Sequence, residues 1–364
     1  MKEKTVLIID DSALMRKMLS IALDNTPGIK VVATAMDPYI AANKINRFKP
    51  DIITLDIQMP RMDGLTFLSK LMVANPVPVI MVSAFTDKGA NETMKALQMG
   101  AVDFILKPNY EDSSKWENFI EELIEKIKSI DSDKIQKKLI NKPVLPANPM
   151  VVEKKYSADV IIPKKKILKY NIKTDKIIVI GASTGGTEVI DRVLSELPEE
   201  IPGIVIAQHM PEKFTEAFAN RVNTHSRLYV KEAEDSERIY SGMAVVAPGG
   251  RHMILKHDKD GYFVVLNDGP PVNRHRPSVD VLFRSAAQCA GKNAIGVILT
   301  GMGNDGAEGL LEMRDEGAVT AAQDEESCVV FGMPNEAIKR NAACEVLNIE
   351  EIIEFIKDYS YTRV

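Results

Sequence analysis

The chain has 364 residues, of which 45% are hydrophobic and 27% are charged, and its formal net charge is −5. This composition is typical of a globular protein with two or three domains, and it excludes collagen-like and wholly disordered chains. There is no run of 18 uncharged apolar residues, so we expect no membrane-spanning helix. The opening residues, MKEKTVLIIDDS, are charged and do not resemble a signal peptide.

The cysteines and the distribution of charge narrow the class of protein further. Cys289, Cys328 and Cys344 are too few and too widely spaced for a disulfide framework or a closed zinc site, which predicts a reduced, cytoplasmic setting. Residues 131–174 contain 11 lysines and only four acidic residues, whereas the flanking segments are both net acidic. The acidic second half argues against nucleic-acid binding, because phosphate contacts require clustered cations.

Residues 1–130 alternate between strand-like and helix-like patterns. Apolar residues recur at helical spacing between the strand candidates, as at Leu14, Met18 and Ile21. The pattern predicts a flavodoxin-like domain with a five-stranded parallel sheet. Its expected strands are residues 5–9, 29–35, 51–55, 77–82 and 101–105.

The segment 131–174 loses this alternation. Four prolines interrupt it, glycine is absent and lysine is abundant, which predicts a semi-extended linker. Its first part, with Ile135, Leu139 and Ile140, is compatible with a continuation of the preceding helix.

A second α/β pattern occupies residues 175–364 and predicts a doubly wound, mainly parallel domain. The expected strands are 177–180, 203–207, 243–247, 263–266 and 294–300, and the expected helices are 189–197, 214–222, 279–290, 307–316 and 349–359.

Polar residues follow several strand candidates of the first domain. Asp10 and Asp11 follow the first strand, Asp56 ends the third, Ser83 ends the fourth and Lys107 follows the fifth. The carboxyl ends of parallel strands meet at one edge, so these groups are expected to cluster there. Crowded carboxylates favour Mg²⁺, and the lysine and hydroxyl suit phosphoryl oxygens. Each aspartate alone is equally compatible with a helix N-cap.

The segments IIDDS, TLDIQMPRMDG, VSAF and FILKP resemble a response-regulator receiver domain over about residues 1–125. The resemblance implies phosphorylation of Asp56 by a chemotaxis histidine kinase and a Mg²⁺ site. The implied ligands are Asp10, Asp11, Asp56 and the Gln58 backbone carbonyl, and the implied switch residues are Ser83, Phe104 and Lys107. It also implies a cis peptide between Lys107 and Pro108.

The second domain begins with a serine on a glycine-rich turn. Residues 181–186, GASTGG, have the form G-x-S-x-G after a strand and before a helix, which favours a nucleophile at Ser183. A phosphate-binding P-loop would need lysine where Thr187 stands, and a dinucleotide-binding loop would need glycine at Ser183. An ordinary glycine-rich turn remains an alternative for this segment.

A serine nucleophile requires a base and an acid. His209 follows the strand candidate 203–207, and Asp305 follows the strand candidate 294–300, so both are expected at the same sheet edge as Ser183. His252 and His275 lie in predicted cleft loops and are weaker candidates for the base. We expect His225 and His257 to be solvated surface residues.

The segments GASTGG, AQHMP, APGGRHM, RHRPSVDVLF, TGMGNDG and GMP together resemble the chemotaxis protein-glutamate methylesterase and glutamine deamidase family. The resemblance implies a Ser183–His209–Asp305 triad, Thr184 and Met302 as neighbours of the site, and no cofactor for ester hydrolysis. It implies methyl-accepting chemoreceptors as substrates, without membrane insertion. One departure is Ser236, where the family tends to have glycine.

The joined domains suggest control by phosphorylation. We expect the unphosphorylated receiver to cover the sheet edge that bears Ser183, and phosphorylation of Asp56 to draw Ser83 and Phe104 inward and loosen the contact. The alternative is an output domain of another class, either DNA-binding or nucleotide-binding. Against these stand the net acidic second half and the altered glycine pattern.

Overall fold

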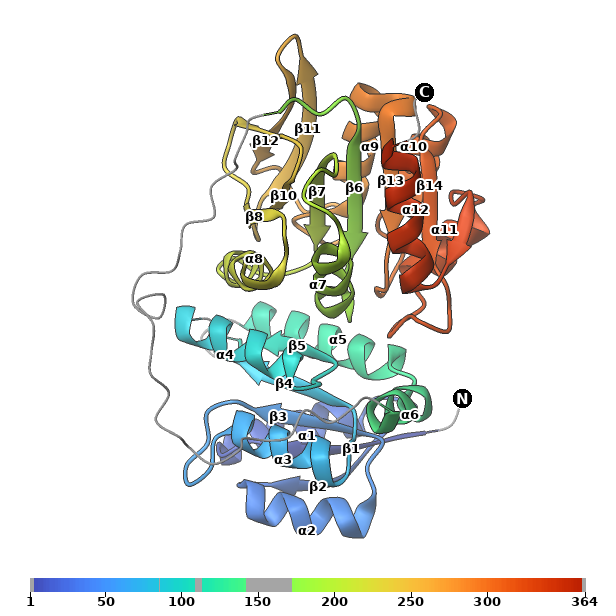
Figure 1. Cartoon of the computed structure of the whole chain (residues 1–364). Helices are drawn as coiled ribbons and strands as arrows, with labels where there is room; N and C mark the ends of the chain where they lie inside the picture. Colours follow the sequence, from blue (N-terminus) through green and yellow to red (C-terminus); the bar gives the residue numbers. More distant parts are fainter. Residues whose placement is uncertain (1–2, 85, 109–112, 142–171, 362–364) are drawn as a thin grey trace.

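The computed structural model describes residues 3–84, 86–108, 113–141 and 172–361, which form two α/β domains (Figure 1). In the N-terminal domain, five parallel strands pair in the order β2-β1-β3-β4-β5, with helices on both faces. The elements are β1 Lys4–Ile9, α1 Ala13–Asp24, β2 Ile29–Ala35, α2 Pro38–Phe48, β3 Ile52–Asp56, α3 Gly64–Ala74, β4 Val79–Ser83, α4 Asp87–Gln98, β5 Asp103–Leu106, α5 Ser113–Ser129 and α6 Ser132–Asn141.

The sequence explains where the helices of this domain begin. Side chains of Ser12, Asp37, Asp63 and Thr86 cap the first turns of α1 to α4 by accepting backbone amide hydrogens. The central strands β3 and β4 are buried along their whole length, as expected for a parallel sheet covered on both faces.

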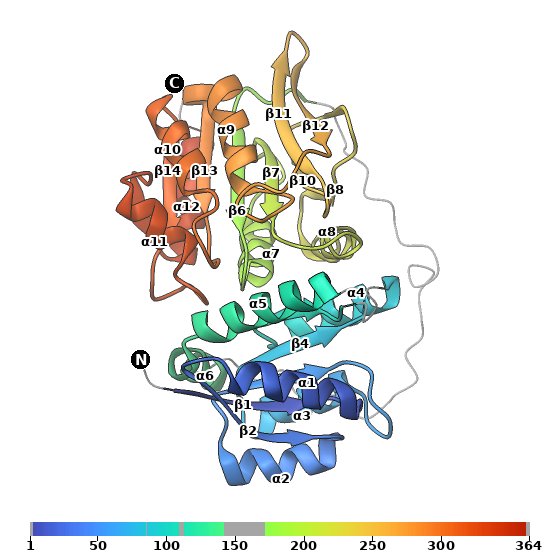
Figure 2. The same cartoon turned by 180° about the vertical axis from the view of Figure 1, so that it is seen from behind.

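The C-terminal domain contains a seven-stranded parallel sheet in the order β15-β14-β13-β6-β7-β10-β8. A separate antiparallel sheet, β11-β12-β9, packs beside it (Figure 2). The strands are β6 Ile177–Ala182, β7 Gly203–Gln208, β8 Tyr229–Glu232, β9 Glu237–Arg238, β10 Met243–Val246, β11 His252–Asp258, β12 Gly261–Asn267, β13 Ala294–Ile298, β14 Val319–Gln323 and β15 Glu345–Leu347.

Helices cover both faces of the parallel sheet, which confirms the predicted doubly wound class. These are α7 Gly186–Glu196, α8 Phe214–His225, α9 Val279–Ala290, α10 Ala307–Asp315, α11 Met333–Lys339 and α12 Ile349–Tyr361. Six elements of this domain are not among those predicted, because most are short or lie in weakly patterned segments: β8, β9, β11, β14, β15 and α11.

Helix α6 lies where the sequence predicts the start of the linker. It is separated from α5 by Ile130 and Asp131, so it does not continue that helix. Ile135 of α6 is buried, and Lys134 donates a hydrogen bond to the Glu325 backbone carbonyl of the C-terminal domain. Residues 142–171 of the predicted linker lie outside the described residues. None of the described helices has the length and apolar character needed to cross a membrane.

The two domains are in direct contact through α4, α5 and β5 of the first and α7 and α8 of the second (Figures 1 and 2). Phe104 stacks on Phe214, with ring centroids 4.9 Å apart. The Arg221 guanidinium donates to the Met94 carbonyl at 3.2 Å. Strand β5, at the edge of the first sheet, therefore reaches the beginning of α8 in the second domain.

Candidate functional sites

The carboxylates Asp10, Asp11 and Asp56 lie together at the carboxyl edge of the first sheet. One oxygen from each lies within 4.8 Å of the others. Asp10 Oδ2 is buried and accepts no hydrogen bond from any described residue, although Lys107 Nζ lies 3.0 Å away. Three crowded carboxylates that present only oxygen atoms, with a single lysine beside them, fit a small, hard cation.

The electrostatics of Asp56 reflect this crowding. Lys107 Nζ contacts Asp56 Oδ2 at 2.6 Å, yet burial, assisted by the Asp10 charge, raises the Asp56 pKa above its ordinary value. The two carboxylates in turn raise the Lys107 pKa despite its burial. Ionisation of Asp56 is therefore energetically unfavourable relative to a carboxylate in water, and a bound cation would make it more favourable.

The remaining receiver residues take different positions. Ser83 Oγ accepts a hydrogen bond from Thr93 Oγ1 at 2.8 Å, and among the described residues it donates none to Asp56. Phe104 is buried against the second domain. The backbone N–H of the exposed Gln58 donates to Asp56 Oδ1 at 3.2 Å. The expected cis peptide at Lys107–Pro108 is wrong: among the described residues the cis peptide is Arg276–Pro277. The trans form, which X-Pro bonds favour by about 0.5–1 kcal/mol, already places Lys107 on Asp56.

In the second domain, three neighbouring strands deliver the predicted triad. Strand β6, which leads to Ser183, lies between β13, which leads to Asp305, and β7, which leads to His209. The Ser183 amide donates to the Thr300 carbonyl at 3.0 Å, and the His209 amide donates to the Ala182 carbonyl at 3.1 Å. Backbone hydrogen bonds thus continue past the strand ends. They fix the positions of the loops after β6, β7 and β13 relative to one another.

Two glycines permit the tight packing around Ser183. Gly185 has a φ of +77°, and a Cβ on it would lie 2.5 Å from the Val329 Cβ. A Cβ on Gly301 would lie 2.8 Å from the Ser183 Cβ. Any side chain at either position would displace the serine or its neighbours.

His209 and Asp305 form a close pair. His209 Nε2 and Asp305 Oδ2 are 2.8 Å apart, and their side chains are only 6% and 2% exposed. His209 Nδ1 is buried and has no hydrogen-bond partner among the described residues. With Nε2 committed to the carboxylate, Nδ1 is the nitrogen that remains to accept a proton. The common triad template uses the two nitrogens in the opposite order.

Ser183 lies at the same cavity as His209 but is not bonded to it. Across the described part of the chain, no hydrogen bond joins the Ser183 hydroxyl to His209. Both residues line one cavity of about 680 Å³. A serine–histidine bond that forms only on substrate binding is common in nucleophilic enzymes.

Asp305 is saturated with hydrogen bonds. Burial raises the pKa of Asp305. The hydrogen bonds that it accepts from His209, Asn273 and the Val279 amide outweigh burial and hold this pKa below its ordinary value. The other donors are Ser278 Oγ at 2.8 Å and the Asp280 amide at 3.2 Å, so the carboxylate lies at the N-terminus of α9. Such a carboxylate stays ionised and holds a fixed orientation.

The other histidines have identifiable roles. The His275 ring stacks on His209 with centroids 3.7 Å apart, and burial together with the His209 charge lowers the His275 pKa to about 3. His252 begins β11, is buried, accepts the Ser278 amide at Nδ1 and contacts the Pro270 carbonyl through Nε2. His225 ends α8 and pairs with Asp191. His257 is exposed on β11, as expected for a surface residue.

The cavity that contains Ser183 is bounded on one side by the receiver. Its lining includes Asn118, Glu121, Glu122, Glu125 and Lys126 of α5, together with Met302 and Thr184. The Thr184 hydroxyl donates to Asp103 Oδ2 of the receiver at 2.7 Å, and buried Lys126 contacts the same oxygen at 2.5 Å. The sequence did not indicate Asp103 or Lys126, because their role depends on contact between domains.

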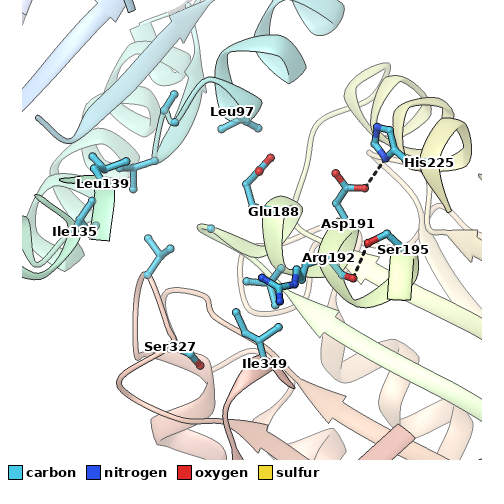
Figure 3. Close-up of a pocket in the computed structure, with 16 residues that line it drawn as sticks. Leu97, Ile135, Leu139, Glu188, Asp191, Arg192, Ser195, His225, Ser327 and Ile349 are labelled. Atoms are coloured by element: carbon cyan, nitrogen blue, oxygen red, sulfur yellow. Dashed lines mark hydrogen bonds and ion pairs between the residues drawn. The ribbon is translucent and has the colours of Figure 1, made fainter. Parts of the chain in front are cut away.

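A second cavity of about 510 Å³ lies between the domains (Figure 3). One wall carries apolar side chains of the receiver and α6, including Leu97, Ile135 and Leu139. The other wall carries Glu188 and Asp191 of α7, with His225 bonded to Asp191. Ser183 and Asp305 do not line it.

Comparison with known proteins matches the two domains to two different families. Residues 178–356 match the family described as CheB methylesterase, and residues 6–115 match the response regulator receiver domain. A protein-glutamate methylesterase/protein-glutamine glutaminase of Geobacter metallireducens is 50% identical over 347 residues, covering 95% of this chain and 93% of the relative. The chain belongs to the CheB methylesterase family.

Two further comparisons agree with this family assignment. A similarly named protein of Xanthomonas axonopodis pv. citri is 50% identical over 341 residues, covering 94% of this chain and 96% of the relative. The crystal structure of the Thermotoga maritima CheB methylesterase catalytic domain is 41% identical, with a TM-score of 0.49, and covers 50% of this chain and 97% of that chain. The names of the Geobacter and Xanthomonas relatives do not favour a DNA-binding or nucleotide-binding output domain.

Proposed function

We propose that this chain is a cytoplasmic, phosphorylation-regulated hydrolase that demethylates glutamyl methyl esters on methyl-accepting chemoreceptors. The same site would convert glutamine to glutamate with release of ammonia. The observation that carries the proposal is that Ser183 and His209 line one cavity and that His209 pairs with Asp305, the three residues following three adjacent strands. The relatives bear the corresponding names.

The chemistry is acyl transfer through the serine. His209 Nδ1 takes the proton of the Ser183 hydroxyl as the oxygen attacks the γ-carbonyl carbon of the ester. Asp305 stabilises the charged imidazole through Nε2. Backbone amides beside the nucleophile would stabilise the oxyanion, and one such donor is typically worth about 3 kcal/mol. His209 then protonates the leaving methoxide, so methanol departs and an acyl-serine remains.

Hydrolysis of the acyl-serine completes the cycle. His209 Nδ1 takes a proton from water, and the resulting hydroxide attacks the acyl carbon. The collapse returns the proton to Ser183 Oγ and releases glutamate. In this scheme the protons move only among Ser183, His209, water and the leaving group, while Asp305 holds the imidazole.

The receiver would regulate access to this site. Asp10, Asp11, Asp56 and the Gln58 carbonyl would hold Mg²⁺, which when bound neutralises the carboxylates during phosphoryl transfer to Asp56 from a chemotaxis histidine kinase. Phosphorylated Asp56 would attract Ser83 and Lys107 and change the packing of Phe104. The Phe104–Phe214 stack and the Thr184–Asp103 bond support this route, because both join the receiver to the catalytic domain.

Methanol release from methylated receptor membranes tests the enzymatic proposal. Ser183→Ala should lower the rate by about 10⁴-fold or more, because it removes the nucleophile. Wild-type activity in Ser183→Ala would remove the serine mechanism. Asp56→Asn with and without a small phosphodonor tests regulation: the donor should stimulate the wild type and leave the variant unchanged. Equal stimulation of both proteins would contradict control through Asp56.

A further inference from the structure

A tight turn lies directly against the His209–Asp305 pair. The backbones of Val272 and His275 exchange two hydrogen bonds, of 3.0 and 2.9 Å, around Asn273 and Arg274. Asn273 and Arg274 have φ values of +51° and +67°, as a two-residue turn of this kind requires at both central positions. Asparagine is well suited to the first position because it tolerates the left-handed conformation better than most residues.

This turn places the Asn273 amide between two carboxylates. Asn273 Nδ2 donates to Asp280 Oδ2 at 2.6 Å and to Asp305 Oδ1 at 2.8 Å. Both hydrogens of the amide are therefore committed, one to each acid. Glycine would share the backbone conformation but supply no donor, and lysine or arginine would place a full charge beside Asp305.

Asp280 is a buried acid that the reaction scheme does not use. Its Oδ1 accepts the Gly309 amide at 2.7 Å, and its Oδ2 faces Asn273. Burial and the nearby Asp305 charge raise the Asp280 pKa to about 6. Without a donor between them, the two carboxylates would repel each other, and Asp305 would be drawn away from His209.

We propose that Asn273 is a positioning residue for the triad, holding Asp305 in line with His209 by bridging it to Asp280. This inference rests on the proposed function, in which Asp305 orients the imidazole. Asn273 does not line the cavity that Ser183 and His209 share, and it reaches the triad through its hydrogen bond to Asp305. The remaining donors, Ser278 Oγ and the backbone amides of α9, limit the damage when it is lost.

The principal test replaces Asn273 with glycine, which keeps the left-handed backbone and removes only the amide. Asn273→Gly should lower kcat for methanol release about tenfold and leave KM within twofold, because a displaced catalytic group slows chemistry more than binding. Asn341→Gly is the matched control: Asn341 is also left-handed, at φ +53°, but lies after α11 and outside both described sites. It should retain wild-type kcat.

A double variant separates bridging from general damage to the turn. In Asp280→Asn, the residue keeps an oxygen for the Gly309 amide but no longer repels Asp305. Asn273→Gly should then cost no more than about twofold relative to Asp280→Asn alone. A tenfold loss in both backgrounds, an unchanged kcat in Asn273→Gly, or a rise in KM alone would overturn the proposal. Failure of the proposed function would be recognised separately, by undiminished methanol release in Ser183→Ala.

Discussion

The receiver and the catalytic domain each place an aspartate at the carboxyl edge of a parallel sheet, but they treat it in opposite ways. Asp56 is crowded by Asp10 and has its pKa raised, chiefly by burial. Asp305 is surrounded by donors that lower its pKa in spite of burial. In the proposed function, Asp56 changes its chemical state and its ionised form is disfavoured by burial, whereas Asp305 remains an anion and accepts five hydrogen bonds.

The largest expected effect comes from neutralising the stabilised acid. Asp305→Asn should lower kcat about 10⁴-fold, because the amide favours the wrong imidazole tautomer. Asp56→Asn, measured without phosphodonor, should leave the basal rate within about twofold of the wild type. Methanol release under identical conditions checks both variants. Similar losses of methanol release in Asp305→Asn and Asp56→Asn would contradict the proposed difference between the two aspartates.

A smaller effect tests the acid beside Asp305. Because the Asp280 pKa is raised to about 6, its ionisation should reduce the free energy of unfolding as pH rises from about 4 to 7. At a pH below both the ordinary pKa of 3.8 and the folded-state pKa of about 6, the Asp280 side chain is protonated in the folded and the unfolded state. Its ionisation then contributes nothing to the free energy of unfolding. The stability of Asp280→Asn relative to the wild type should therefore increase by about 1–2 kcal/mol between pH 4 and pH 8. Denaturant unfolding at the two pH values measures it, and a constant difference would contradict the assignment.

The smallest expected effect concerns Asp56 itself. Since its folded-state pKa is raised, ionisation lowers stability above that pKa, and the difference vanishes below the ordinary value near 3.8. In buffer without divalent cations at pH 8, Asp56→Asn should stabilise the protein, and by less than Asp280→Asn does. Thermal unfolding followed by circular dichroism provides the measurement. Destabilisation at pH 8 would indicate that the Lys107 contact outweighs the crowding.

Much of this arrangement can be predicted from the sequence because strand ends are local features. Asp10, Asp56, Ser183 and His209 each follow a short apolar run, and in a parallel sheet such positions meet at one edge. The resemblance to known families added the roles of individual residues. The neighbouring order β13-β6-β7 then follows from pairing between strands and not from any one segment.

Other features depend on contacts that no local pattern records. The imidazole orientation depends on Asp305 and the stacked His275, which is distant in the chain. Asn273 is not indicated by the sequence, because its two acceptors, Asp280 and Asp305, lie on other segments. Ser236, where glycine was expected, adopts a φ of +62°, so the turn keeps the left-handed backbone despite the side chain.

The stack between Phe104 and Phe214 has one more consequence, which follows from thermodynamic reciprocity. If phosphoryl transfer to Asp56 weakens the contact between domains, then whatever separates the domains must favour the phosphorylated form by the same free energy. A receptor segment that enters the cavity beside α5 would compete with the receiver for that space. Abundant substrate would then lengthen the lifetime of phosphorylated Asp56. The phosphorylation level of the receiver would therefore depend on how much substrate is present.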